Sequence, residues 1–159
     1  MAKDTKTNVM RVLESKKIPY TGHTYNPEEA IAGDEVASVL GQNPGQVFKT
    51  LVTVSGKGVH YVFMVPVNKE LNLKAAAKAV GEKSIEMIKS KELLPLTGYI
   101  HGGCSPIGMK KLFTTTIDSS ASNYDKIFFS GGKIGFQVEV AYNDFCRVIP
   151  VQTADITDN

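Results

Sequence analysis

Helical and strand-like spacings of apolar residues occupy different parts of this chain. Val9, Val12 and Leu13 recur at helical spacing behind Thr5 or Thr7, either of which can act as the N-cap of an amphipathic helix. Later in the chain, short runs rich in β-branched and aromatic residues follow one another and are separated by glycine-containing turns. The pattern predicts helices mostly in the first half and adjacent strands in the second half.

The first half contains one clear hairpin signal among its helices. Two β-rich runs, 47–54 and 59–65, flank Ser55-Gly56-Lys57-Gly58, which supplies the residues with positive φ that a tight turn requires. Around this hairpin the sequence predicts an extended segment over 20–25, a short helix capped by Asp34 and ended by Gly41, a helix over 73–80 capped by Asn72, and another short helix opened by Ser84.

The second half is predicted to consist mainly of strands. They lie over 99–100, 114–117, 126–129 and 136–140, the last two are joined through 131–135, and Asn143 caps a final short helix. Helices and strands do not alternate with a βαβ period. The expected class is therefore α+β, with a mixed and mainly antiparallel sheet flanked by helices.

Composition and charge narrow the class of protein further. The chain has 159 residues, 42% hydrophobic and 21% charged, which suits a single domain spanning 1–159. A net charge of +2 is too small to predict wholesale wrapping of a nucleic acid, and DNA binding is not expected. Two cysteines are too few for a disulfide framework, and no run approaches the roughly 18 apolar residues of a membrane span. We expect a cytoplasmic protein without a membrane partner.

A lysine interrupts the apolar strand predicted over 47–54. Alternation along the strand places Val47, Lys49 and Leu51 on one face. Two uses fit a lysine in such a row: it reaches a ligand in a cavity, or it guards a sheet edge against mispairing. In a cavity, its ammonium would be a strong donor to an anion or a carbonyl oxygen. The pattern alone leaves both interpretations open.

Two glycine pairs stand out in the second half. In Gly102-Gly103, followed by Cys104-Ser105-Pro106, consecutive peptide N–H groups can point inward and stabilise an oxyanion or bind a phosphate, but a tight connection would use the same residues. The pair Gly131-Gly132 lies where a hairpin turn is expected, and we interpret it as that turn.

The other reactive residue types form no catalytic pattern. His23, His60 and His101 lack the spacing of metal ligands, and only His101 adjoins the glycine-rich loop, so no metal or other cofactor is expected. Ser105 lacks the surroundings of a nucleophilic serine, and Cys104 is interpreted as a small buried residue rather than a thiol nucleophile.

Two further features stay open. Tyr20 suits core packing and a hydroxyl at the mouth of a pocket equally well. A set of lysines suits either an ordinary solvated surface or the steering of an RNA end: Lys74, Lys78, Lys83, Lys89, Lys91, Lys110 and Lys111.

Taken together, these residues resemble the YbaK/EbsC family of aminoacyl-tRNA deacylases, which is related to the editing domain of bacterial prolyl-tRNA synthetases. The resemblance runs along the whole chain and implies an α+β fold whose sheet is partly barrel-like. It rests on ordered motifs at similar spacing: Ile18-Pro19-Tyr20, His23-Thr24-Tyr25, Gly33-Asp34-Glu35-Val36, Val47-Phe48-Lys49-Thr50-Leu51, Leu71-Asn72-Leu73-Lys74, Thr97-Gly98-Tyr99, residues 102–111, and Ser130-Gly131-Gly132-Lys133.

The resemblance also implies the residues of the site. Members of the family often carry an acidic residue in the strand after Gly-Gly-Lys; here Gln137 stands at that place, with Glu139 two residues further on the same strand face. The implied assignments are Lys49, Gly102 and Gly103 for catalysis, and Tyr20, Ser105, Pro106 and Gln137 for substrate binding.

The activity implied by the resemblance is trans-editing, the hydrolysis of cysteine wrongly attached to proline tRNA. In the family mechanism the substrate's own thiol attacks its ester carbonyl and expels the tRNA as a cyclic thiolactone forms, so the protein only positions and polarises the ester. The implied partners are mischarged tRNA and prolyl-tRNA synthetase. Two alternatives remain: a deacylase of the same fold acting on Ala-tRNA(Pro) or another aminoacyl-tRNA, and a non-catalytic module that binds an amino acid or a tRNA 3′ end.

Overall fold

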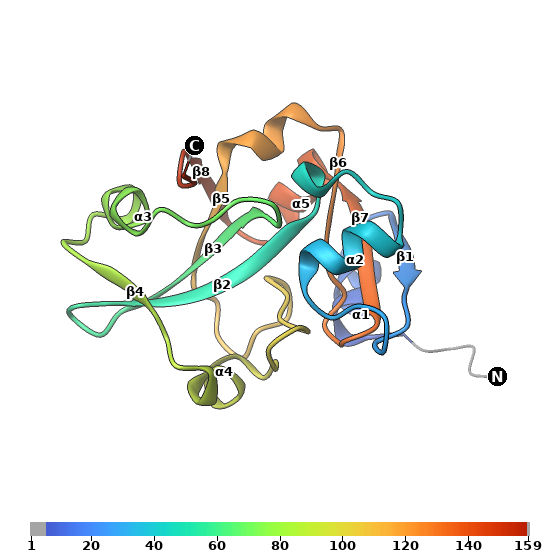
Figure 1. Cartoon of the computed structure of the whole chain (residues 1–159), viewed down its shortest axis with the longest axis horizontal. Helices are drawn as coiled ribbons and strands as arrows, with labels where there is room; N and C mark the ends of the chain where they lie inside the picture. The colour runs from blue at the N-terminus through green and yellow to red at the C-terminus, as the bar shows by residue number, and fades with distance from the viewer. Residues whose placement is uncertain (1–5, 159) are drawn as a thin grey trace.

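The computed structural model describes residues 6–158, which form two β-sheets surrounded by short helices (Figure 1). The strands are β1 (Tyr20–Thr24), β2 (Phe48–Ser55), β3 (His60–Pro66), β4 (Ile85–Met87), β5 (Thr114–Asp118), β6 (Lys126–Ser130), β7 (Phe136–Ala141) and β8 (Val151–Ala154). The helices are α1 (Asn8–Ser15), α2 (Gly33–Val39), α3 (Leu73–Val80), α4 (Ser90–Thr97) and α5 (Tyr142–Val148), with 3-10 turns η2 (Pro44–Gln46) and η3 (Ser119–Asn123).

The two sheets differ in the direction of their strands. The three-stranded sheet, in the order β1-β7-β6, is antiparallel throughout. In the five-stranded sheet, in the order β4-β2-β3-β5-β8, the first three strands are antiparallel and the last two join in parallel. The α+β class with a mixed and mainly antiparallel sheet is confirmed. Between residues 6 and 158 the pairings leave two sheets rather than a closed ring, so the barrel-like part is not confirmed.

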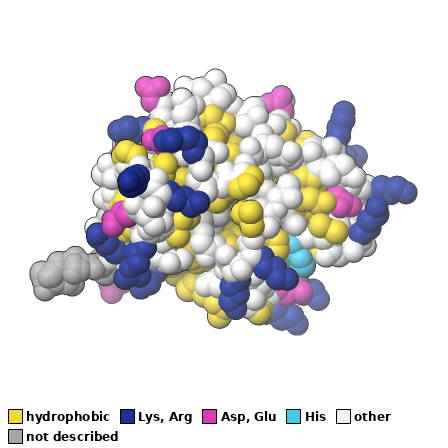
Figure 2. All heavy atoms as spheres, turned by 180° about the vertical axis from the view of Figure 1, so that it is seen from behind, with side chains coloured by type: hydrophobic (Ala, Val, Ile, Leu, Met, Phe, Trp, Pro, Cys, Tyr) yellow, Lys and Arg dark blue, Asp and Glu magenta, His cyan; other side chains and the backbone are white. Residues whose placement is uncertain are grey.

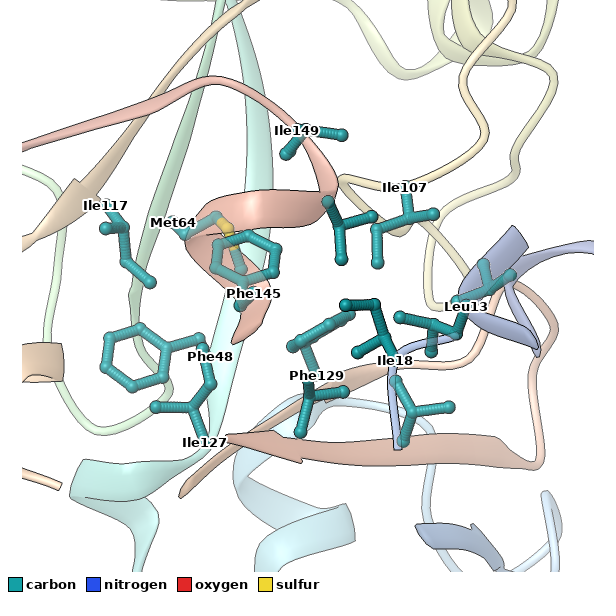
Figure 3. Packing of buried hydrophobic residues seen from close by; sticks show 14 of the residues in the cluster. Leu13, Ile18, Phe48, Met64, Ile107, Ile117, Ile127, Phe129, Phe145 and Ile149 are labelled. Carbon is teal, nitrogen blue, oxygen red and sulfur yellow. The ribbon is translucent and has the colours of Figure 1, made fainter. Parts of the chain in front are cut away.

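A large hydrophobic core joins the sheets to α1 and α5. Side chains from β2, β3, β6, α1 and α5 converge in it, and Figure 3 shows how they interlock. The rings of Phe129 on β6 and Phe145 on α5 lie with their centroids 5.1 Å apart, and both side chains are essentially inaccessible to water. A bridge from Val47 to Phe128 ties the start of β2 to β6. This core fixes β2 and β6 relative to each other, and both strands contribute to the cavity described below.

Several local signals act as expected. The hydroxyl of Thr7 accepts a hydrogen bond from Met10 N at 3.2 Å and caps α1, whereas Thr5 lies outside the described residues. Asn72 caps α3 by accepting from Ala75 N at 2.9 Å. The turn 55–58 joins β2 to β3, with φ +84° at Gly58. Capping and turn chemistry therefore located these elements correctly.

Other local expectations were wrong. The helix expected after Ser84 is strand β4, because residues 85–87 pair with 53–55 of β2. The strand expected over 99–100 is an irregular segment after α4, whose C-cap Gly98 has φ +88°. Helix α2 is capped by Ala32 instead of Asp34, and α5 by Ala141 instead of Asn143.

Helix α4 and strand β8 were not predicted, because the sequence offers only weak local signals for them. Lys89 at the N-cap of α4 provides no side-chain cap hydrogen bond, and Pro95 lies inside the helix. Within residues 6–158, no helix combines the length and apolar character needed to cross a bilayer.

Candidate active site

A cavity of about 590 Å³ is lined by residues of β2, α2, the start of α4 and the glycine-rich loop. Its walls also include residues at the ends of β6 and β7. This volume falls within the range of small-molecule sites in proteins. The residues that line it are Tyr25, 31–36, 47–52, Val67, Met87, Ile88, Ser90, Leu93, His101, Gly102, Cys104, Phe129, Ser130, Phe136 and Gln137.

Lys49 lines this cavity from β2. Its Cα partner in β3 is Val65, and its side chain is 28% exposed. The ammonium Nζ lies 3.7 Å from Oε2 of Glu70, a carboxylate that is 82% exposed. An ion pair with so exposed a partner is weak, because water screens it. The Lys49 ammonium can therefore exchange this contact for an anion or a carbonyl oxygen inside the cavity.

The two glycines of the loop have different surroundings. Gly102 lines the cavity with φ +90°, and a Cβ added to it would lie 2.9 Å from Cγ2 of Ile31. The Gly103 N–H donates to the carbonyl of Ile100 at 3.0 Å, and a Cβ there would lie 3.1 Å from the backbone N of Ile134. Gly103 is thus packed against the β6–β7 turn, and of the pair the structure brings only Gly102 to the cavity.

Ser105 and Pro106 do not line the main cavity. Ser105 is fully buried, and its hydroxyl accepts a hydrogen bond from Ile107 N at 3.4 Å. Pro106 lines a separate hollow of about 80 Å³. Both residues shape the turn that follows Cys104, so any effect they have on a substrate in the main cavity is indirect.

Tyr20 and Tyr25 lie in different places relative to the cavity. The Tyr20 hydroxyl donates to Oε2 of Glu14 on α1 at 2.6 Å, and desolvation together with this bond raises the pKa of Tyr20 to about 12. Tyr20 is not one of the residues that line the cavity, whereas Tyr25 is. The signal for Tyr25 was present in the His23-Thr24-Tyr25 motif, but its position on the cavity wall depends on the path of the loop after β1.

Gln137 lines the cavity from β7 and is held by a reciprocal pair of amide hydrogen bonds. Gln42 Nε2 donates to Gln137 Oε1 at 2.7 Å, and Gln137 Nε2 donates to Gln42 Oε1 at 2.8 Å. Gln137 is 2% exposed. Since Gln42 follows the C-terminus of α2, this pair ties α2 to the three-stranded sheet. Glu139 does not line the cavity; its carboxylate contacts His23 Nε2 at 2.8 Å.

Sequence reasoning missed several hydroxyl-bearing residues of the cavity wall, among them Thr50 and Ser130. The Oγ1 atom of Thr50 is buried without a hydrogen-bond partner, next to the lysine that the pattern singled out. A buried hydroxyl without a partner is costly and suits a ligand atom that would satisfy it. Cys104 also lines the cavity, and burial raises the pKa of its thiol to about 12, which keeps the thiol protonated near neutral pH.

Metal-binding groups and surface charge add little to the description of the site. Over residues 6–158, no three His, Cys, Asp or Glu side chains gather closely enough to hold a metal ion. Figure 2 shows the face opposite the view of Figure 1, where Lys and Arg side chains form several separate groups among apolar ones. A face of this kind suits a local contact with an anionic partner better than a continuous track for a nucleic acid.

The sequence matches a domain model and is similar to two known proteins whose names refer to tRNA. Residues 27–148 match the model of the aminoacyl-tRNA editing domain. Over 153 residues, covering 96% of this chain and 93% of the relative, the sequence is 45% identical to the Enterococcus faecalis protein named "Putative Cys-tRNA(Pro)/Cys-tRNA(Cys) deacylase EbsC". Over 82 residues it is 34% identical to a proline–tRNA ligase of Shouchella clausii, covering 52% of this chain and 14% of the ligase.

Solved structures share the fold. The crystal structure of the hypothetical protein APE2540 matches with a TM-score of 0.87 and 20% identity, covering 96% of this chain and all of that one. A second, described as "a putative trans-editing enzyme for prolyl tRNA synthetase", matches with a TM-score of 0.82 and 23% identity over 98% of this chain. With the family match and the near full-length relative, the predicted resemblance is confirmed: the chain belongs to the family of aminoacyl-tRNA editing domains.

Proposed function

We propose that this protein is a trans-editing hydrolase that deacylates Cys-tRNA(Pro), with residues 1–159 acting as one domain. The observation that carries the proposal is the joint presence of Lys49 and Gly102 in one cavity of about 590 Å³. A cationic donor and a loop peptide are the groups that polarise an ester carbonyl and receive its developing negative charge. The 45% identity to a relative named for this reaction supports the same substrate.

The reaction needs no nucleophile from the protein. The sulfur of the bound cysteine forms a bond to its own ester carbonyl carbon, and the bond from that carbon to the ribose oxygen breaks. A thiolactone and a free tRNA hydroxyl result. In this scheme Lys49 and the Gly102 peptide stabilise the oxyanion, and Gln137 shapes the amino-acid end of the cavity. The Cys104 thiol is protonated near neutral pH and takes no covalent part.

Selection by chemistry suits a cavity of this size better than selection by fit. A pocket that admits cysteine cannot exclude alanine by size, because one small group changes binding by only about 1–3 kcal/mol. A step that requires the substrate's thiol rejects alanine for lack of a nucleophile. Seryl esters react slowly because a hydroxyl is a poorer nucleophile than a thiol near neutral pH.

The setting of this activity is part of the same proposal. We place the protein in the cytoplasm, where mischarged tRNA is formed, and we propose prolyl-tRNA synthetase as the source of tRNA selectivity. The structural neighbour described as a trans-editing enzyme for that synthetase supports the pairing. The test measures binding of the protein to prolyl-tRNA synthetase with and without tRNA(Pro).

A deacylation panel tests the function. We expect rapid loss of cysteine from Cys-tRNA(Pro), much slower loss of alanine and serine from the same tRNA, and unchanged rates after exhaustive chelation. Faster turnover of Ala-tRNA(Pro) would favour an alanine-editing enzyme. Binding of all three substrates without turnover would favour a non-catalytic module.

A further inference from the structure

We infer that His101 is a further catalytic residue, which takes the proton from the substrate thiol and delivers it to the leaving ribose oxygen. The inference rests on the proposed function. It assigns a proton carrier to a reaction for which Lys49 and Gly102 provide only charge stabilisation.

Thiol-assisted cleavage has a proton problem at both ends. A cysteine thiol has a pKa near 8.5, so most of it is protonated and weakly nucleophilic at pH 7. The ribose oxygen leaves as a strongly basic alkoxide unless a proton reaches it. One group that accepts a proton and then returns it solves both problems, and its affinity for protons has to be near the working pH.

Few cavity residues can do this. The carboxylates that line the cavity are Asp34 and Glu35, and carboxylates are weak bases toward a thiol. Glu35 is also engaged, because its Oε1 accepts hydrogen bonds from the backbone N–H groups of Ile31 and Ala32, both at 3.1 Å. Cys104 stays protonated near neutral pH. An imidazole suits the task, and among the residues that line the cavity only His101 carries one.

The three histidines of the chain differ in the contacts that their rings make. His23 contacts Glu139 at 2.8 Å, and the His60 ring lies against Phe113 with centroids 6.1 Å apart. The hydrogen bonds and ion pairs found among residues 6–158 include none to the ring of His101, an exposed residue that lines the cavity. A free imidazole at a ligand cavity is available for proton transfer.

The backbone holds this imidazole next to the proposed oxyanion donor. His101 directly precedes Gly102, whose positive φ, together with an Ile31 side chain that would lie 2.9 Å from an added Cβ, restricts the course of the loop. The charged groups that face the loop across the cavity are Lys49 of β2 and the two carboxylates of α2. The loop therefore presents a proton acceptor and a peptide N–H within two consecutive residues.

The proton balance closes. The thiol gives its proton to a ring nitrogen of His101 as the sulfur–carbon bond forms. The same proton passes to the ribose oxygen as the carbon–oxygen bond breaks. The enzyme ends in its starting protonation state, and the products are the thiolactone and tRNA with a free hydroxyl.

The test compares His101→Gln with the matched control His60→Gln in single-turnover deacylation of Cys-tRNA(Pro) between pH 6 and pH 9. We expect His101→Gln to lower the rate at pH 7 by about 100-fold, the lower end of general-base effects, with little change in the substrate concentration needed for half-saturation. Its rate should rise with pH as thiolate accumulates, and added imidazole should restore part of it. His60→Gln should retain the wild-type profile.

Each other outcome counts against the inference. A rate for His101→Gln within threefold of wild type at pH 7 would overturn the inference. A variant that only needs more substrate for half-saturation, with an unchanged maximal rate, would reassign His101 to substrate binding. Melting temperature and circular dichroism identify misfolding, and in that case His101→Asn is measured in the same way. If the wild-type protein does not turn over Cys-tRNA(Pro), both the proposed function and the role of His101 are refuted. If the wild-type protein is active and His101→Gln is equally active, only the role of His101 is refuted.

Discussion

The two Gly-Gly pairs of this protein look alike in sequence but have different neighbours. Gly102 and Gly132 both have positive φ, +90° and +96°. A Cβ on Gly132 would lie 2.8 Å from Cγ2 of Val9 in α1, whereas Gly102 lines the cavity under Ile31. Close packing requires glycine in both places. A glycine pair alone therefore says little about chemistry, and what the backbone faces decides the role of each loop.

The strongest test of this comparison uses the lysine near each loop. Lys49→Ala removes the cation of the cavity wall and should lower kcat/KM for deacylation by about 100-fold or more, because one lost oxyanion stabiliser typically has that effect. Lys133→Ala, in the exposed β6–β7 turn, should stay within about threefold of wild type. Thermal denaturation should show both variants folded. Equal losses from the two substitutions would remove the distinction between the loops, and near-normal turnover by Lys49→Ala would return that lysine to a structural role.

The glycines themselves give the next largest effect. Gly102→Ala and Gly132→Ala both place a Cβ at positive φ and should each lower the free energy of unfolding by roughly 1–3 kcal/mol. Only Gly102→Ala should also lower kcat/KM of the folded fraction, by about tenfold, because it displaces the peptide beside the ester. Measuring activity together with the folded fraction separates the two effects. Loss of specific activity in Gly132→Ala would contradict the assignment of that pair to a turn.

A smaller effect is expected from the Gln42–Gln137 amide pair, which ties the end of α2 to β7. Gln42→Ala removes both hydrogen bonds to the buried Gln137 amide and should lower the free energy of unfolding by about 1–3 kcal/mol. With α2 less firmly held, KM should rise by roughly threefold. The matched control is Gln46→Ala, which loses a 2.8 Å bond to the carbonyl of Lys126 outside the cavity wall. An equal KM in the two variants would show that the Gln42–Gln137 pair does not position the cavity wall.

The smallest effect is predicted for Cys104, although it lies in the glycine-rich loop and lines the cavity. Because burial raises the pKa of its thiol to about 12, the neutral form dominates from pH 7 to pH 9. Cys104→Ala should therefore keep kcat/KM within about threefold of wild type across that range. An inactive but folded variant, or a trapped cysteinyl adduct on Cys104, would instead indicate covalent catalysis.

Sequence was most informative where one residue type meets a local geometric demand. Asn72 at a helix start and Gly58 in a hairpin turn satisfy nearby backbone groups, so their elements were predicted correctly. Strand β4 was mistaken for a helix because Ser84 suits an N-cap and the apolar spacing after it is ambiguous over so few residues. Its partner is β2, and no local signal identifies a strand that depends on distant pairing.

The candidate site was predictable in part for the same reason. Lys49, Gly102 and Gln137 were named from motifs, and the structure places all three in one cavity. Tyr25 and Thr50 were passed over, because the lining of a cavity depends on how loops cross between elements rather than on spacing along the chain. The glycine pair showed where the backbone is constrained, but only the fold distinguishes Gly102, which lines the cavity, from Gly103, which packs against a turn.

The pairing of β1 with β7 also determines when the enzyme can begin to work during its synthesis. Tyr20 pairs with Val140, so β1 has to wait for its partner until the ribosome has synthesised β7. The β2–β3 hairpin can form early because its strands are adjacent, whereas contacts distant in sequence form late. The cavity also needs Ser130 and Gln137 from β6 and β7. A nascent chain that stalls before β7 thus carries β1 without its partner and an incomplete cavity, and editing activity requires that β6 and β7 have been synthesised.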